Sequence, residues 1–150
     1  EMLTALSNGD IDGFIAWEPY PTRATIEGAG WVFKPSSEIQ PRHPCCVLAV
    51  SEKAHRGRAG EIRRMVNAHR RAIDFIRDHP AVSAAIGAKY TGFPVATILS
   101  AMATIKYSSD LDPGSVSEYL VFLNSSGYTK IQDPEKFAAG ILGLDAGAGK

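Results

Sequence analysis

The residues Asp10-Ile11-Asp12-Gly13-Phe14-Ile15-Ala16-Trp17-Glu18-Pro19-Tyr20 form the stretch on which the predicted fold rests. Gly13 to Trp17 carry no charge and are bulky enough for a strand buried on both faces, which is the pattern of a parallel sheet. Glu18-Pro19 then begins a helix, because proline is favoured in the first helical turn and an acidic side chain complements the positive helix end. Trp17 and Glu18 are therefore predicted at the carboxyl end of a strand, where open α/β sheets bind ligands.

Helices and strands alternate on either side of this stretch. A helix is expected from Met2 to the Asn8-Gly9 stop, and a second one ends at about Glu27. Trp31-Val32-Phe33 and Cys45 to Val50 are apolar enough to be further strands, and the proline-rich residues 34–44 between them read as a loop. Such alternation is typical of the α/β fold class.

Helices are predicted to dominate the rest of the chain. The clearest periodicity runs from Glu61 to Arg77, where apolar residues recur at helical spacing along one face. Further helices are expected at 81–88, at 95–102, after Asp112-Pro113 and after Asp133-Pro134, with a brief strand or extended crossing at 105–108.

Composition excludes several classes of protein. Sixteen Lys and Arg residues balance sixteen Asp and Glu residues, so no global field favours nucleic acid or a membrane surface. The uncharged apolar stretches are shorter than the roughly 20 residues of a membrane-spanning helix. Two adjacent cysteines, Cys45-Cys46, fit neither a disulfide framework nor zinc-site spacing, and no metal site is expected.

Because the chain begins within what reads as a helix, we expect a fragment whose signal segment lies upstream.

Several motifs together resemble the extracytoplasmic substrate-binding proteins of ABC importers, in the branch that takes up nitrate, sulfonates, taurine, bicarbonate and pyrimidine precursors. The first motif is Leu6 to Tyr20, and the second is His43-Pro44-Cys45-Cys46-Val47-Leu48. The long helix followed by His79-Pro80, and the segment from Tyr107 to Pro113, complete the set. The resemblance covers nearly the whole chain and is more specific for the superfamily than for the ligand.

The resemblance implies a periplasmic-binding-protein type II fold, in which two α/β lobes close on a ligand. Members are considerably longer, so this chain would be the C-terminal half. Residues 1–40 would end one lobe, 41–46 would cross the hinge, 47–142 would belong mainly to the other, helix-rich lobe, and 143–150 would be a frayed tail. The implied partners are a small polar or anionic organic solute, a membrane ABC permease and a missing N-terminal half. No cofactor, nucleic acid or enzymatic activity is implied, and the implied location is extracytoplasmic.

The candidate ligand-binding residues are Trp17, Glu18, Pro19, Tyr20 and His43. Trp17 offers a flat apolar wall and Glu18 a carboxylate, which would favour a ligand with a donor or a cation. The alternatives are that Trp17 is a core residue and that Glu18 only caps a helix. His43 precedes the presumed hinge strand and could donate to a polar or anionic ligand, or could be a solvated loop histidine.

Two other functions stay open. Eight of the sixteen basic residues lie between Lys53 and Arg77, and helix-turn-helix signals between residues 86 and 105 suggest a DNA-binding regulator. The helix after that turn is almost wholly apolar, which favours a core role, because base recognition needs polar side chains. Cys45 or Cys46 beside His43 could serve a cysteine-dependent enzyme, although both thiols open a strand that reads as buried.

Overall fold

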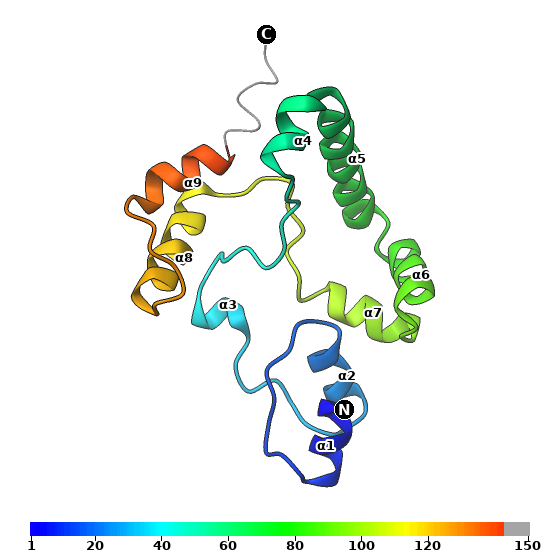
Figure 1. Cartoon of the computed structure of the whole chain (residues 1–150). Helices are drawn as coiled ribbons and strands as arrows, with labels where there is room; N and C mark the ends of the chain where they lie inside the picture. The colour runs from blue at the N-terminus through cyan, green and yellow to red at the C-terminus, as the bar shows by residue number, and fades with distance from the viewer. Residues whose placement is uncertain (143–150) are drawn as a thin grey trace. The chain divides into compact units, whose positions relative to one another are not determined.

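A computed structural model describes residues 1–142, so the predicted tail at 143–150 lies outside the described residues. The described chain contains nine α-helices (Figure 1). Their bounds are α1 Met2–Asn8, α2 Tyr20–Ile26, α3 Ser36–Ile39, α4 Glu52–Gly57, α5 Ala59–Asp78, α6 Pro80–Thr91, α7 Val95–Met102, α8 Pro113–Ser125 and α9 Pro134–Leu142.

Local signals account for where these helices begin and end. The carboxylate of Asp112 accepts a hydrogen bond from the backbone N–H of Gly114 at 3.1 Å and so caps α8. Asp133 does the same for α9 through the N–H of Lys136 at 2.9 Å. Gly9 ends α1 with φ 78°, a left-handed conformation that glycine adopts at low cost. The helices predicted at 61–77, 81–88 and 95–102 are confirmed, and lie within α5, α6 and α7.

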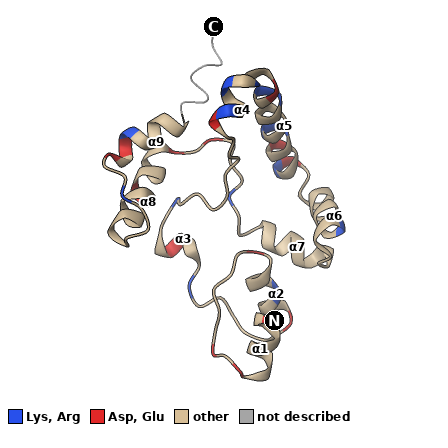
Figure 2. Cartoon of the chain, in the orientation of Figure 1, with Lys and Arg blue, Asp and Glu red and all other residues tan. Residues whose placement is uncertain are grey.

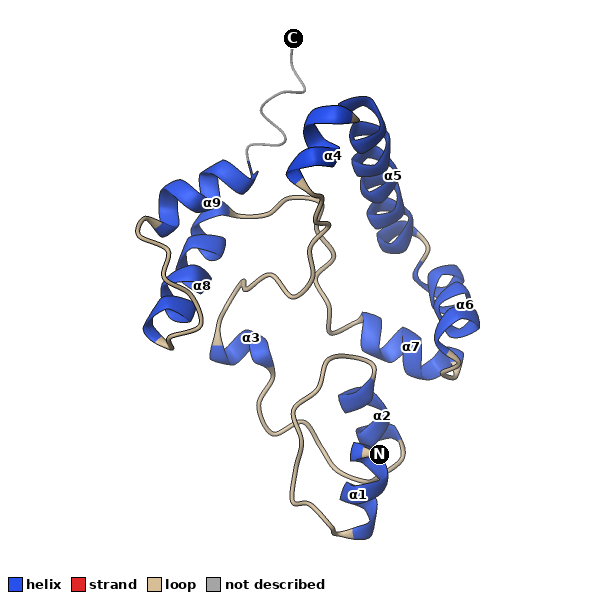
Figure 3. Ribbon diagram, viewed as in Figure 1, coloured by secondary structure: helices blue, strands red, loops and turns tan. Residues whose placement is uncertain are grey.

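The predicted strands are not present in residues 1–142 (Figure 3). Residues 13–17, 31–33 and 45–50 have no helical or strand structure apart from a bend at residue 33, and the α/β class is therefore not confirmed. A strand requires a neighbour to which its backbone N–H and C=O groups can bond, and no segment of the described chain provides one. The apolar side chains stay exposed as a result: Ile15 is 99% exposed, Trp31 80% and Phe33 89%.

The chain divides into two compact units, which are described separately. Unit 1 comprises residues 1–35 and 71–107, and unit 2 comprises residues 36–70 with residues from 108 onward. The long helix α5 contributes residues to both units. None of the helices in the described chain is long and apolar enough to cross a membrane.

Small residues make the core of unit 1. Helix α7 packs against both α6 and α2. Ala84 of α6 is completely buried, Ile98 and Ala101 of α7 are nearly so, and Ala24 is the buried residue of α2. Short side chains at this contact allow the helix backbones to approach closely.

In unit 2, α8 packs against α9, and the amide of Asn124 holds the connection between them. Its Nδ2 donates to the carbonyl of Ile131 at 2.7 Å. Its Oδ1 accepts from the Thr129 hydroxyl at 2.7 Å and from the backbone N–H of Ile131 at 2.9 Å. One half-buried side chain therefore satisfies three polar groups of the turn.

Candidate functional site

Glu18 lies in unit 1 immediately before α2, and its carboxylate bonds to the protein. The Oε2 atom accepts from the backbone N–H of Thr22 in the first turn of α2 at 3.2 Å. The Oε1 atom lies 3.3 Å from the hydroxyl of Thr104, which follows α7. That hydroxyl donates over a shorter distance, 2.8 Å, to the carbonyl of Ala101. The bond from the Thr22 N–H thus supports the alternative that Glu18 caps a helix.

Tyr20 joins an aromatic cluster with residues from two parts of the sequence. Its ring meets that of Phe93 edge-on, with ring centroids 5.5 Å apart. The Trp17 ring also meets the Tyr20 ring edge-on, with centroids 6.4 Å apart. Trp17 is 73% exposed, so it is not a core residue. Edge-to-face pairs of this kind are worth about 0.5–1.5 kcal/mol beyond the area they bury.

Arg23 completes this group and was not among the candidates from the sequence. Its guanidinium carbon lies 5.7 Å from the centroid of the Phe93 ring, within the range of a cation–π contact. Its Nε also donates to Glu27 at 2.6 Å. The spacing Tyr20, Arg23, Glu27 follows one face of a helix, a signal that could have placed Arg23 beside the tyrosine.

Two small pockets of unit 1 share Arg23 and Glu27 as walls. One has a volume of about 270 Å³ and is bounded further by Tyr20, Phe14 and residues of α1. The other, also about 270 Å³, is bounded by Phe93 and its neighbours in residues 91–94. This is slightly below the roughly 300–1,000 Å³ common for ligand pockets. A guanidinium paired with a carboxylate suits a small polar solute better than a bare anion, because Glu27 offsets the charge of Arg23.

His43 lies in unit 2, whereas the other candidate residues, Trp17 to Tyr20, lie in unit 1. Its half-buried ring bonds through Nδ1 to the carbonyl of Gln40 at 2.7 Å. A carbonyl only accepts, so this nitrogen carries the proton and Nε2 is the acceptor of the neutral ring. The sequence prediction that His43 contacts a ligand stays a prediction.

Cys45 and Cys46 are exposed free thiols, and the expectation that they are buried in a strand is wrong. The hydrogen bond with Cys46 raises the pKa of the Cys45 thiol, and partial burial and the neighbouring charge raise it further. A raised pKa disfavours the thiolate that a catalytic nucleophile needs. Within residues 1–142, no cluster of three or more His, Cys, Asp or Glu side chains is arranged to hold a metal ion.

Seven of the eight basic residues between Lys53 and Arg77 lie on α4 and α5 (Figure 2), and Arg58 lies between the two helices. Several are paired with acids on the same helices: Arg56 with Glu52, and Arg77 with Asp74 at 2.7 Å. Helix α7, the counterpart of a recognition helix, buries Thr97, Ile98 and Ala101, as the apolar sequence led us to expect. The arrangement offers little support for DNA recognition, which needs exposed polar side chains on that helix.

Comparison with curated proteins finds the bicarbonate transport ATP-binding protein CmpC of Synechocystis sp., 42% identical over 52 residues. The match covers 35% of this chain and 8% of that protein, so the chain spans only a small part of its relative. No solved structure matches.

A family model gives the broader match. It is that of the NMT1-like family, and it covers residues 1–89, which include Trp17, Glu18, Pro19, Tyr20 and His43. This region extends over more than half of the chain. The chain therefore belongs to the NMT1-like family, a family of the substrate-binding type of ABC transporters.

Proposed function

We propose that the protein is the solute-binding component of an ABC-type import system and captures a small polar or anionic organic solute. The observation that carries the proposal is the family match over residues 1–89. The importer partner would be a membrane permease, the location extracytoplasmic, and the role non-enzymatic. The relative involved in bicarbonate transport supports uptake of small solutes in general.

The aromatic residues at the start of α2 are the proposed ligand contacts. Trp17 is 73% exposed and Tyr20 borders one of the small pockets, so both have a face to offer. Pro19 lies between them as the residue just before α2, and the Glu18 carboxylate accepts from the Thr22 N–H in the first turn of that helix. Arg23 and Glu27 supply the polar groups of the same pocket. His43, in unit 2, is a separate proposed contact for a polar solute.

The two-lobed arrangement is part of the proposal. Residues 1–40 would end one lobe, 41–46 would cross the hinge, and 47–142 would form most of the other lobe. Solute contacts made by both lobes would favour the closed state, which the permease then recognises. The exposed apolar segments at 13–17, 31–33 and 47–50 suit strand pairing with an N-terminal half outside these 150 residues.

A thermal-shift screen of the full-length gene product against sulfonates, nitrate, bicarbonate and pyrimidines tests the function. A bound solute at 100 times its Kd should stabilise the protein by about 2.7 kcal/mol. Trp17→Ala should lose this shift. Tyr90→Ala is its matched control, because Tyr90 is an aromatic residue of α6 that is 82% exposed in the same unit and lines neither pocket. Absence of a shift with every solute, or equal loss in both variants, would contradict the proposal. The intact mass of the natural product tests the missing half.

A further inference from the structure

Cys45 and Cys46 form a pair of thiols on one side of the chain in unit 2. Both are exposed, and their sulfur atoms are 3.8 Å apart. In a regular strand, neighbouring side chains point to opposite faces. Here the sulfur separation is no larger than the distance of about 3.8 Å between consecutive Cα atoms, so the thiols lie next to each other.

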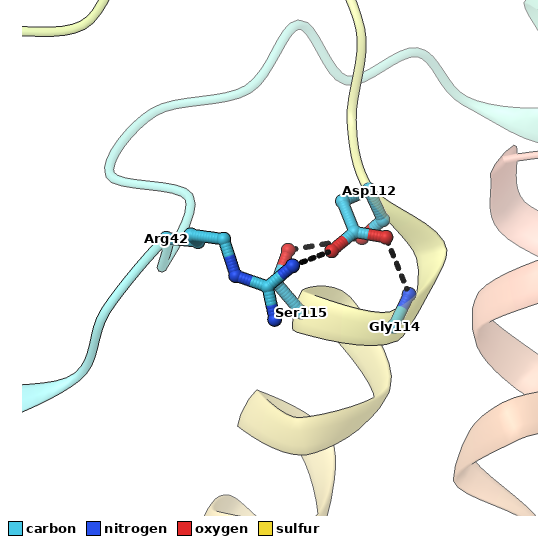
Figure 4. Close-up of polar contacts among 4 residues, drawn as sticks. All are labelled: Arg42, Asp112, Gly114 and Ser115. Carbon is cyan, nitrogen blue, oxygen red and sulfur yellow. Dashed lines mark hydrogen bonds and ion pairs between the residues drawn. The ribbon is translucent and has the colours of Figure 1, made fainter.

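The segment that carries the two thiols has a side-chain contact on each side within unit 2. On one side, Arg42 bonds to the Asp112 carboxylate at 3.3 Å, and this carboxylate also caps α8 (Figure 4). On the other side, the Ser51 hydroxyl accepts from the N–H of Ala54 at 3.2 Å and caps α4. The Arg42–Asp112 ion pair therefore ties the chain to the start of α8 three residues before Cys45.

We propose that Cys45 and Cys46 are a dithiol site that chelates trivalent arsenicals. Two sulfurs bonded at about 2.3 Å to one thiophilic centre cannot be more than about 4.6 Å apart. The two sulfurs lie within this limit, at 3.8 Å from each other. Soft thiolate ligands select soft centres, and an organoarsenical needs only two sulfur ligands because carbon occupies its third position. A metal ion would need further protein ligands, and no such cluster exists in residues 1–142.

The binding step is a condensation that requires no oxidant. An organoarsenic oxide forms two arsenic–sulfur bonds, and its oxygen leaves as water with the two thiol protons, so arsenic and sulfur keep their oxidation states. The raised pKa of Cys45 means that this thiol enters the reaction in its protonated form at neutral pH, and its proton leaves with the oxide oxygen as water. A disulfide between the same residues is disfavoured, because adjacent Cα atoms are about 3.8 Å apart and disulfides usually need about 4.4–6.8 Å.

Titration of the protein with phenylarsine oxide, followed by intact mass and by free-thiol assay, tests the site. The expected result is one phenylarsenic group per chain, minus two hydrogens, with loss of both free thiols. A small dithiol should remove the adduct and a monothiol should not. Cys45→Ser and Cys46→Ser should each weaken binding by about 100-fold, because the second bond of a chelate forms intramolecularly.

Two results would overturn the proposal. One is the absence of an adduct on the unmodified protein, or an adduct that a monothiol removes. The other is equal affinity of the wild type and either serine variant, which would mean that one thiol binds alone. Serine is nearly the same size as cysteine and both positions are exposed, so the variants are expected to fold, and circular dichroism verifies it.

Discussion

The role of Glu18 can be separated by experiment into helix capping and ligand binding. Its carboxylate accepts from the Thr22 N–H at 3.2 Å, and removal of such a cap costs about 0.5–2 kcal/mol. The contact with Thr104 adds little, because the single hydroxyl proton lies closer to the Ala101 carbonyl, at 2.8 Å against 3.3 Å. We therefore expect Glu18→Ala to lower the free energy of unfolding by about 1 kcal/mol, most of it from the cap.

Urea denaturation followed by circular dichroism measures this difference in the absence of any solute. Glu18→Gln keeps an oxygen acceptor for the Thr22 N–H and should lose less than Glu18→Ala. Glu118→Ala, at an exposed position within α8, is the control and should change stability by no more than about 0.5 kcal/mol. An unchanged or higher stability of Glu18→Ala would refute the capping argument and indicate a carboxylate held for a ligand.

Three other changes follow from the described contacts. Asn124→Ala should lower the free energy of unfolding by about 2–3 kcal/mol in urea denaturation, because three hydrogen bonds of about 1 kcal/mol each are lost. Asn124→Asp loses only the bond donated to Ile131, so its stability should fall between that of Asn124→Ala and that of the wild type. Equal stability of all three proteins would contradict this. Ala84→Leu should lower the free energy of unfolding by about 1–3 kcal/mol in the same assay, because Ala84 is completely buried. Ala85→Leu, on the exposed face of α6, should leave the free energy of unfolding nearly unchanged. Similar losses in both variants would show that α6 does not pack as described. Burial raises the pKa of Tyr107 above its unfolded value of about 10. The neutral phenol therefore stabilises the fold below pH 10, about the unfolded pKa, and this contribution disappears as the pH rises through the folded pKa. Tyr107→Phe should lack this alkaline loss of stability in pH-dependent melting, and a profile equal to that of the wild type would count against the argument.

Several parts of the fold were predictable because their causes are local. The Asp112-Pro113 and Asp133-Pro134 pairs mark the starts of α8 and α9, where each aspartate accepts a backbone hydrogen bond a few residues on. The apolar sequence of α7 indicated a core helix, and the structure buries three of its residues. Such signals act within one turn of helix and do not depend on the rest of the chain.

The strand predictions show where local reasoning ends. Residues 13–17 and 45–50 have apolar strand-like sequences, but a strand exists only when another segment accepts and donates its backbone hydrogen bonds. Within residues 1–142 no such segment is present, so Ile15 is 99% exposed and the thiols of Cys45 and Cys46 are exposed as well. The apolar pattern predicted burial, and it could not predict the partner.

The sequence by itself determined the helices after residue 59, the helix starts at Asp-Pro pairs and the substrate-binding character of the family that the motifs resemble. Only the tertiary structure decided the surroundings of the candidate site. Phe93 lies at least 70 residues after Tyr20 and Arg23 in the chain, and Glu18 meets Thr104, 86 residues further along, only in the folded unit. Contacts between distant residues depend on how helices pack, and no spacing along the chain encodes that packing.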